Sequence, residues 1–157
     1  MLNNIMETIK KIYLDDIRTP LDSSWIVVRN YNEFIDKIKE IGLNNIDIIS
    51  FDHDLGDSAI EEYMRNVIKN YTIDYSNIIE KTGYDAIKWL VDYFYELNPE
   101  RFELSNEDKK KNKITFPKIY VHSANPVGAH NICGFVNNFL KNERQPQDCV
   151  RVKIEHN

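Results

Sequence analysis

Short apolar runs alternate along the chain with longer segments in which apolar residues recur every three or four positions. Runs of four to eight residues that are rich in β-branched and aromatic side chains and bounded by polar residues are typical of strands buried on both faces of a sheet. We therefore predict strands at Lys11–Leu14, Trp25–Arg29, Ile46–Phe51 and Lys118–His122, with a fifth at Cys149–Ile154.

The segments between these runs have helical spacing. Asn30–Ile41, Gly83–Leu97 and Asn131–Leu140 each place their apolar residues on one face. Asn30 or Asn32 is positioned to cap the first of these helices, and Gly42 follows it as a stop signal. Strands that alternate with helices predict an α/β fold with a mostly parallel sheet.

Two long segments interrupt this alternation. Residues 57–81 are expected to be partly helical over Ile60–Asn70, and residues 98–117, which include the charged stretch NEDKKKNK, are expected to form an exposed loop. We interpret both segments as insertions in one domain that spans residues 1–157, because a chain of 157 residues suits a single domain.

Composition excludes several classes of protein. The chain is 42% hydrophobic and 29% charged, as in ordinary globular proteins, and its net charge of −5 gives no basic field for an extended nucleic-acid surface. No apolar run approaches the roughly 18 residues of a membrane span, and no secretory signal is evident at the N-terminus. Cys133 and Cys149 lie far apart and complete no zinc site, so we expect a reduced, cytoplasmic protein without a membrane partner.

Acidic and polar residues follow three of the predicted strands. In parallel α/β sheets, ligands bind beyond the carboxyl ends of the strands, so residues at these ends are expected to converge on one pocket. The three groups are Asp15-Asp16, Asp52-His53-Asp54 and His122-Ser123-Ala124-Asn125.

The carboxylates in these groups suit a hard cation. Grouped carboxylates are costly to bury unless a cation neutralises them, and Mg²⁺ prefers oxygen ligands. Asp15, Asp16 and Asp52 are the candidate ligands for Mg²⁺ or Mn²⁺, which would polarise a phosphoryl oxygen or lower the pKa of a bound water.

The neighbouring side chains suit phosphate chemistry. Ser123 can donate a hydrogen bond to a phosphate oxygen, and Arg18 can offer a forked donor to the same group. Histidine side chains ordinarily exchange protons near neutral pH, so His53 or His122 is a candidate general acid or base.

Each of these features also has an ordinary structural explanation. Paired aspartates at a strand end often cap a helix or form a turn, and FDHDLG is compatible with an Asx-rich turn. His122 could be a satisfied core histidine, Asn125-Pro126 a turn signal, and Arg18 a surface residue. The presence of two acidic strand ends in one small chain makes coincidence the weaker explanation.

Considered together, the motifs LDDxR, SFDHDLG, TGYD and VHSxNPVG resemble those of the cyclic-phosphate processing receiver domains, from about Lys11 to Leu140. The resemblance implies a receiver-like (flavodoxin-like) three-layer sandwich with a four- to five-stranded parallel sheet in the order 2-1-3-4. Only a short link containing Pro20 joins the first two strands, so we expect the usual first helix to be missing.

The resemblance also implies roles for individual residues. In the related response-regulator receivers, an aspartate pair after the first strand and an aspartate after the third strand bind Mg²⁺, and these positions match Asp15, Asp16 and the phosphoacceptor position Asp52. Ser123 matches the hydroxyl residue that contacts the phosphoryl group. Asn125 and Arg18 would bind phosphate beside it, and Asp54 would orient the site. His53 and Asp54 after the phosphoacceptor position, and the lack of a Lys-Pro pair after the fifth strand, depart from signalling receivers.

These departures favour turnover or specialised ligand binding. The resemblance implies a metal-dependent phosphohydrolase that acts on cyclic phosphate, including 2′,3′-cyclic phosphate ends of damaged RNA, and hence a role in RNA repair. Asp52 would hold the metal or form an aspartyl-phosphate, and His53 or His122 would move the proton. The expected partner is a phosphate-containing small molecule or an RNA end.

Two alternatives remain open. One is a non-catalytic receiver-like module that binds phosphate or a protein partner, or accepts phosphate on Asp52 as a switch. The other is a small interaction protein made of the fold and its two insertions, which would have no affinity for metal.

Overall fold

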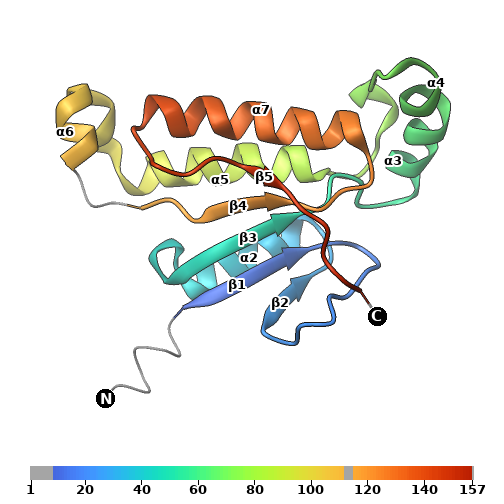
Figure 1. Cartoon of the computed structure of the whole chain (residues 1–157), viewed down its shortest axis with the longest axis horizontal. Coiled ribbons are helices and arrows are strands. Elements are labelled where there is room, and N and C mark those ends of the chain that lie inside the picture. The colour runs from blue at the N-terminus through green and yellow to red at the C-terminus, as the bar shows by residue number, and fades with distance from the viewer. Residues whose placement is uncertain (1–8, 112–114, 157) are drawn as a thin grey trace.

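The computed structural model describes residues 9–111 and 115–156, and its centre is a five-stranded sheet (Figure 1). The strand order is β2-β1-β3-β4-β5, and every neighbouring pair is parallel. This result confirms the predicted α/β class and the order 2-1-3-4, and it places a fifth strand of two residues beside β4. The strands are β1 (Lys10–Leu14), β2 (Trp25–Val28), β3 (Ile46–Phe51), β4 (Lys118–Val121) and β5 (Val150–Arg151).

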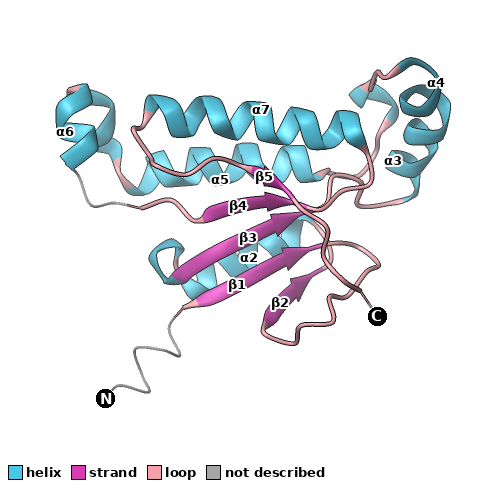
Figure 2. Cartoon of the chain, in the orientation of Figure 1, coloured by secondary structure: helices cyan, strands magenta, loops and turns pink. Residues whose placement is uncertain are grey.

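Three long helices follow the predicted periodic segments (Figure 2). They are α2 (Tyr31–Ile41), α5 (Gly83–Leu97) and α7 (Pro126–Asn142). The side chain of Asn30 caps α2 by accepting a hydrogen bond from the Glu33 amide. The α7 helix begins five residues before its predicted start of Asn131, because the Asn125 side chain accepts from the Gly128 amide and Pro126 occupies the first helical position.

The two interruptions contain more helix than the sequence indicated. Residues 57–70 form α3 (Asp57–Glu62), a π-helical turn (Tyr63–Val67) and α4 (Ile68–Asn70). The expectation of an exposed loop over residues 98–117 was wrong in part, since this segment contains a 3₁₀ helix (Pro99–Glu103) and α6 (Asn106–Lys111). Ser105 accepts a hydrogen bond from the Asp108 amide at the start of α6, a capping contact that supports a helix there.

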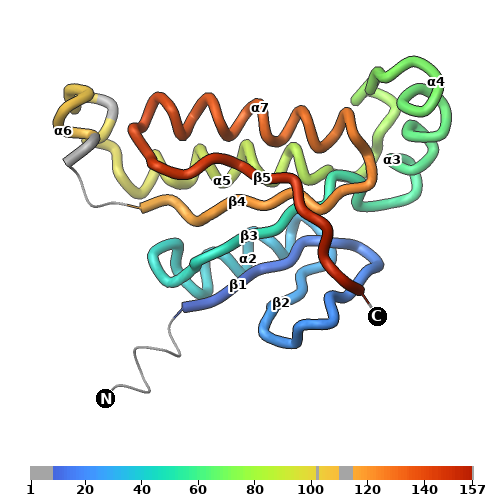
Figure 3. The backbone as a smooth tube through the Cα atoms, viewed as in Figure 1, coloured from blue at the N-terminus to red at the C-terminus, as the bar shows by residue number. Residues whose placement is uncertain are grey.

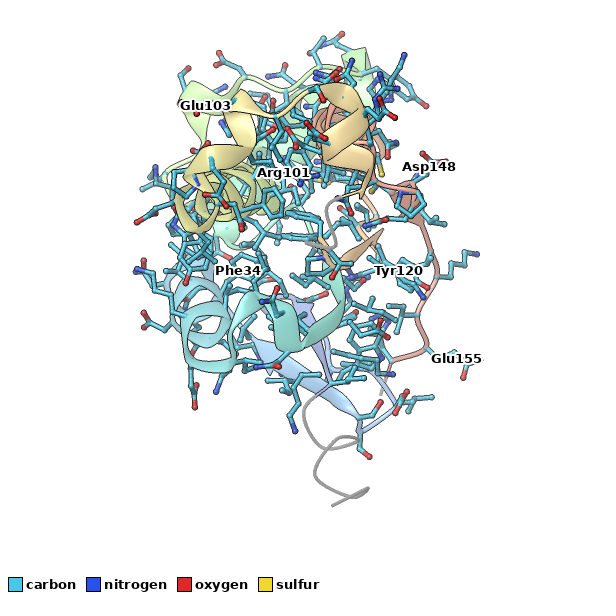
Figure 4. The ribbon with its side chains drawn as sticks, turned by 90° about the vertical axis from the view of Figure 1, so that its left-hand side faces the viewer. Phe34, Arg101, Glu103, Tyr120, Asp148 and Glu155 are labelled. Carbon is cyan, nitrogen blue, oxygen red and sulfur yellow. The ribbon has the colours of Figure 1, made fainter. Side chains whose placement is uncertain are left out.

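The long helices lie on one face of the sheet, as the handedness of the crossovers requires. The connections from β2 to β3, β3 to β4 and β4 to β5 all step in the same direction across the sheet, so right-handed crossovers place α2, α5 and α7 on the same face. Figure 4 shows Phe34 of α2 on one side of the sheet and Glu155 on the other. A core of aliphatic and aromatic side chains fills the space between these helices and the sheet.

The opposite face is crossed by extended chain. No helix forms between β1 and β2 in residues 15–24, which confirms the missing first helix. After β5, the C-terminal segment (Val152–His156) passes in front of β3 and β1 (Figure 3). It is held there by the Leu21 amide, which donates to the Glu155 carbonyl at 2.8 Å, and by an antiparallel bridge from His156 to Pro20. Among the described residues, the face of the sheet opposite the long helices is therefore covered by extended chain and not by a helix.

Within the part of the chain that the structure describes, no helix combines the length and the apolar character needed to cross a membrane.

Candidate functional site

The carboxyl ends of β1, β3 and β4 bring the predicted acidic residues together. Leu14 pairs with Phe51 and Phe51 with Val121, so the residues that follow each strand are neighbours. Carboxylate oxygens of Asp15, Asp16 and Asp52 lie within 4.8 Å of one another. The convergence predicted from the strand ends is therefore present, and this acidic cluster could hold a metal ion.

Asp15 is the most firmly held member of the acidic cluster. Its Oδ1 accepts hydrogen bonds from the amides of Ile17 (3.0 Å) and Arg18 (2.8 Å), and its Oδ2 accepts from Arg18 Nε (2.8 Å) and His122 Nε2 (3.1 Å). Burial raises the pKa of the Asp15 carboxyl, but these hydrogen bonds and the charge of Arg18 outweigh burial and lower the pKa to about 2. Asp15 therefore carries a full negative charge at neutral pH.

Asp52 has the opposite electrostatic balance. Its Oδ1 accepts a hydrogen bond from the His53 amide at 2.8 Å, and Ser123 also hydrogen-bonds to its carboxylate. Burial and the negative charge of Asp15 raise the pKa of Asp52 to about 7, although Arg18 Nη2 lies 3.6 Å from its Oδ2. The pKa of Asp16 is raised too, by burial and by Asp15. The cluster thus holds more negative charge than Arg18 neutralises.

This donor set fits a hard divalent cation. All three groups offer carboxylate oxygens, which are the ligands that Mg²⁺ and Mn²⁺ prefer. The carboxylate of Asp15 already accepts four hydrogen bonds, more than that of Asp52, which accepts from the His53 amide and from Ser123. Asp16, like Asp52, lines the pocket above the cluster. The geometry thus favours Asp16 and Asp52 as direct ligands, with Asp15 adding charge unless Arg18 moves away from it.

A pocket of about 290 Å³ opens above the acidic cluster. Arg18 and Ser123 lie on its wall, as phosphate ligands would, and Ile60 and Tyr63 reach it from the insertion at residues 57–81. No sequence pattern indicates Ile60 and Tyr63 as pocket residues, because their positions depend on how the insertion packs over the strand ends. The full lining is Asp15, Asp16, Ile17, Arg18, Asp52, Asp54, Ile60, Tyr63, Ser123, Ala124 and Asn125.

Asn125 lines the pocket but uses its side-chain amide for structure. Its Oδ1 accepts from the Gly128 amide at 3.0 Å, and its Nδ2 donates to Asp54 Oδ1 at 3.2 Å. The residue therefore fixes both the start of α7 and the position of Asp54.

His53 is fully buried and stands behind Asp54. Its Nδ1 lies 2.6 Å from Asp54 Oδ1, and its Nε2 lies 2.9 Å from the Tyr75 hydroxyl, which also accepts from Asn131. His53 is not among the residues that line the pocket, so its connection to the pocket runs through Asp54, which is one of them.

His122 connects the acidic cluster to the sheet. Burial lowers the pKa of the His122 imidazole, which favours the neutral ring. Because the Asp15 carboxylate accepts a hydrogen bond from Nε2–H, this ring is the Nε2–H tautomer. Ser50 Oγ then donates a hydrogen bond to Nδ1 at 2.7 Å. Tyr13 stacks on the ring with 4.0 Å between centroids. The His122 ring is therefore buried, as a core histidine would be, and it also hydrogen-bonds to a carboxylate of the acidic cluster.

Two glycines let the helices approach the site. A Cβ atom at Gly83 would lie 1.9 Å from the Asp52 carbonyl oxygen, and one at Gly128 would lie 2.3 Å from the His53 ring. The glycines of the TGYD and NPVG motifs are thus required by close packing of α5 and α7 against the residues after β3.

Comparison with known proteins agrees with this geometry. A family model described as "Cyclic-phosphate processing Receiver domain" matches residues 10–138. No curated protein and no solved structure matches the chain significantly.

Proposed function

Because the chain belongs to the family of cyclic-phosphate processing receiver domains, we propose that it is a metal-dependent phosphohydrolase that opens a cyclic phosphate, including 2′,3′-cyclic phosphate ends of RNA. The observation that carries the proposal is the acidic cluster, with carboxylate oxygens within 4.8 Å of one another and a pocket above it that Arg18 and Ser123 also line.

Binding is assigned to residues on the pocket wall. Asp16 and Asp52, with the charge of Asp15, would hold Mg²⁺ or Mn²⁺, which when bound polarises a phosphoryl oxygen and lowers the pKa of water. The guanidinium of Arg18 and the hydroxyl of Ser123 would bind the phosphate oxygens.

Proton transfer is assigned to two histidine–carboxylate pairs. Ring opening breaks one P–O bond and forms another to a water oxygen, so the water must lose a proton and the leaving ribose oxygen must gain one. The pairs His53–Asp54 and His122–Asp15 meet the pocket through their carboxylates, and each pair is joined by a hydrogen bond, of 2.6 and 3.1 Å. His53 would act from behind Asp54, whose carboxylate is the member of that pair at the pocket wall.

Hydrolysis of a nucleoside 2′,3′-cyclic phosphate tests the proposal. We expect ³¹P NMR to show conversion to a phosphomonoester with Mg²⁺ present, and no conversion with the Asp52→Asn variant. Asp47→Asn is the matched control, since Asp47 lies exposed on β3 outside the pocket lining. Equal turnover by the wild type and the Asp52 variant would overturn the assignment.

A non-catalytic receiver-like module is the second candidate. It is favoured by Asp52 itself, whose carboxylate borders the pocket with Ser123 hydrogen-bonded to it, as a phosphoacceptor would require. Incubation with acetyl phosphate and Mg²⁺, followed by intact mass measurement, would then show one added phosphoryl group that persists. Rapid loss of the adduct, or none, together with cyclic-phosphate turnover, would favour the hydrolase.

A further inference from the structure

A second and larger pocket adjoins the acidic one. Its volume is about 700 Å³, and it shares Arg18, Ser123 and Ala124 with the pocket above the acidic cluster. His122 forms part of its inner wall. A ligand whose phosphate contacts Arg18 and Ser123 would therefore have room to continue into this second space, which is of a size typical for small-molecule sites.

The outer wall of this pocket is the chain after β4 and β5. Arg151, the last residue of β5, lines it together with the whole C-terminal segment (Val152–His156). These residues lie beyond the part of the chain that the family model matches, which ends at residue 138. One wall of this pocket is therefore built from residues outside the part of the chain that matches the family model.

The charge of this wall contrasts with that of the acidic cluster. Arg18, Arg151 and Lys153 line the pocket, and among the described residues of its lining Glu155 is the single carboxylate. Arg18 is engaged with Asp15 and Asp52, whereas Lys153 is exposed and projects from a backbone that is fixed at both sides. The Val152 amide donates to the Val121 carbonyl at 2.8 Å, and the Glu155 carbonyl accepts from Leu21.

The guanidinium of Arg151 is also fixed. Its Nη2 donates to the Ser123 carbonyl at 3.1 Å, so this cation is held directly beside one of the residues that the two pockets share. Cations on a hydrogen-bonded backbone, next to the serine whose hydroxyl would bind the first phosphate, are the arrangement expected for a second anionic group of the same ligand.

We propose that this pocket binds a second phosphate of the substrate, so that the preferred ligand is a ribonucleotide that carries one phosphate on the 2′,3′ side of the ribose and another on the 5′ side. The proposal rests on the proposed function for the place of the first phosphate. The second phosphate belongs either to a free nucleotide or to the next linkage of an RNA end, and the two sources share the same chemistry.

Binding of stable product-like nucleotides tests the proposal without turnover. The probes are adenosine 3′-monophosphate, adenosine 3′,5′-bisphosphate and the dinucleotide ApAp with a 3′-terminal phosphate, titrated by calorimetry with Mg²⁺ present. We expect the wild type to bind the bisphosphate at least tenfold more tightly than the monophosphate. Tighter binding of ApAp than of the bisphosphate would identify an RNA end as the source, and the reverse order a free nucleotide.

Variants assign this preference to the pocket. In Lys153→Gln, the ratio between bisphosphate and monophosphate affinity is expected to fall at least threefold, with monophosphate affinity unchanged. Arg151→Lys keeps the charge but not the contact with Ser123, and is expected to lower the ratio less than Arg151→Gln. Lys39→Gln, an exposed lysine of α2 on the other side of the sheet, is the control and should leave the ratio at the wild-type value.

The outcomes separate this proposal from the proposed function. Equal affinity for the two mononucleotides, binding of neither of them, or a preference that survives Lys153→Gln and Arg151→Gln together, would overturn the second phosphate site, even if cyclic phosphate is hydrolysed. If the protein prefers the bisphosphate through Lys153 and Arg151 but hydrolyses no cyclic phosphate, the second phosphate site is supported and only the proposed hydrolase activity is overturned.

Discussion

Arg18 Nε lies 2.8 Å from Asp15 Oδ2, and the same guanidinium reaches toward Asp52. One cation thus sits between two carboxylates of a cluster that is suited to a divalent metal. It neutralises part of the charge that would attract the metal, and it also lines the pocket in which we propose that phosphate binds.

From this arrangement we predict opposite effects of Arg18→Gln on two ligands. The affinity for Mg²⁺ should rise about fivefold, since removing a neighbouring unit charge from a partly exposed site changes the electrostatic energy by about 1 kcal/mol. The affinity for adenosine 3′-monophosphate should fall. Calorimetry measures both, with Arg144→Gln, beyond the end of α7, as the control. Weaker Mg²⁺ binding in the variant would mean that Arg18 organises the carboxylates instead of competing for them.

The raised pKa of Asp52 predicts an inverse dependence of stability on pH. The folded chain holds this proton up to about pH 7, whereas the unfolded chain releases it near pH 4. At this group the folded state therefore binds more protons in this window, so the contribution of Asp52 to stability falls as the pH rises from about 4 to 7. Without metal at pH 8, Asp52→Asn should melt at least about 3 °C above the wild type, equivalent to about 1 kcal/mol.

Thermal unfolding followed by circular dichroism in EDTA checks this prediction. The difference between the two proteins should narrow as the pH is lowered from 8 to 5. Adding Mg²⁺ at pH 8 should raise the melting temperature of the wild type more than that of Asp52→Asn. A metal-free variant that melts at or below the wild-type temperature at pH 8 would contradict the electrostatic account of the cluster.

The acidic cluster could be predicted from the sequence because its determinants are local. Each strand is a short apolar run, and Asp15, Asp16 and Asp52 follow such runs directly, so the shared edge of a parallel sheet brings them together. In contrast, the hydrogen bond between His122 and Asp15 joins residues that are 107 positions apart in the sequence, and no rule based on residue spacing predicts it.

The remaining features depend on tertiary packing. Tyr75 holds His53 from within an insertion whose course the periodicity did not specify. Lys153 lies in the predicted fifth strand, where the sequence indicated no role for it, yet the crossing of the C-terminal segment brings it to a pocket beside the site. The predicted start of α7 was too late because Asn125 and Pro126 are typical both of a turn and of a helix start. The hydrogen bond from the Gly128 amide to the Asn125 side chain, which identifies a helix cap, is visible only in the structure.

Two glycines of the same helix provide a matched test of the packing around His53. A Cβ atom at Gly128 would lie 2.3 Å from the His53 ring, whereas one at Gly134 would meet nothing within 4 Å. We expect Gly128→Ala to lower the free energy of unfolding by about 2 kcal/mol or more, as overpacking of a well-filled core does. Gly134→Ala should raise it by up to about 1 kcal/mol through helix propensity. Urea unfolding measures both, and similar effects of the two substitutions would refute the close approach of α7.

The thiol groups of Cys133 and Cys149 are in contact, although the two residues lie 16 positions apart in the sequence. The two sulfur atoms lie 2.6 Å apart, between α7 and the start of β5, and both side chains are partly exposed. The contact lowers the pKa of the Cys133 thiol and raises that of Cys149, so Cys133 is the expected nucleophile.

We therefore predict that glutathione disulfide crosslinks the folded protein. The Cys133 thiolate would attack glutathione disulfide and release one glutathione, and Cys149, on losing its proton, would displace the second. The product should be lighter than the reduced protein by two hydrogen atoms and, with a crosslink between residues 16 positions apart, more stable by about 3 kcal/mol. Intact mass and thermal unfolding measure both effects, and Cys149→Ser should instead retain a glutathione adduct on Cys133. A folded wild type that keeps both thiols, and forms the crosslink only in denaturant, would show that the two sulfur atoms do not meet in the native state.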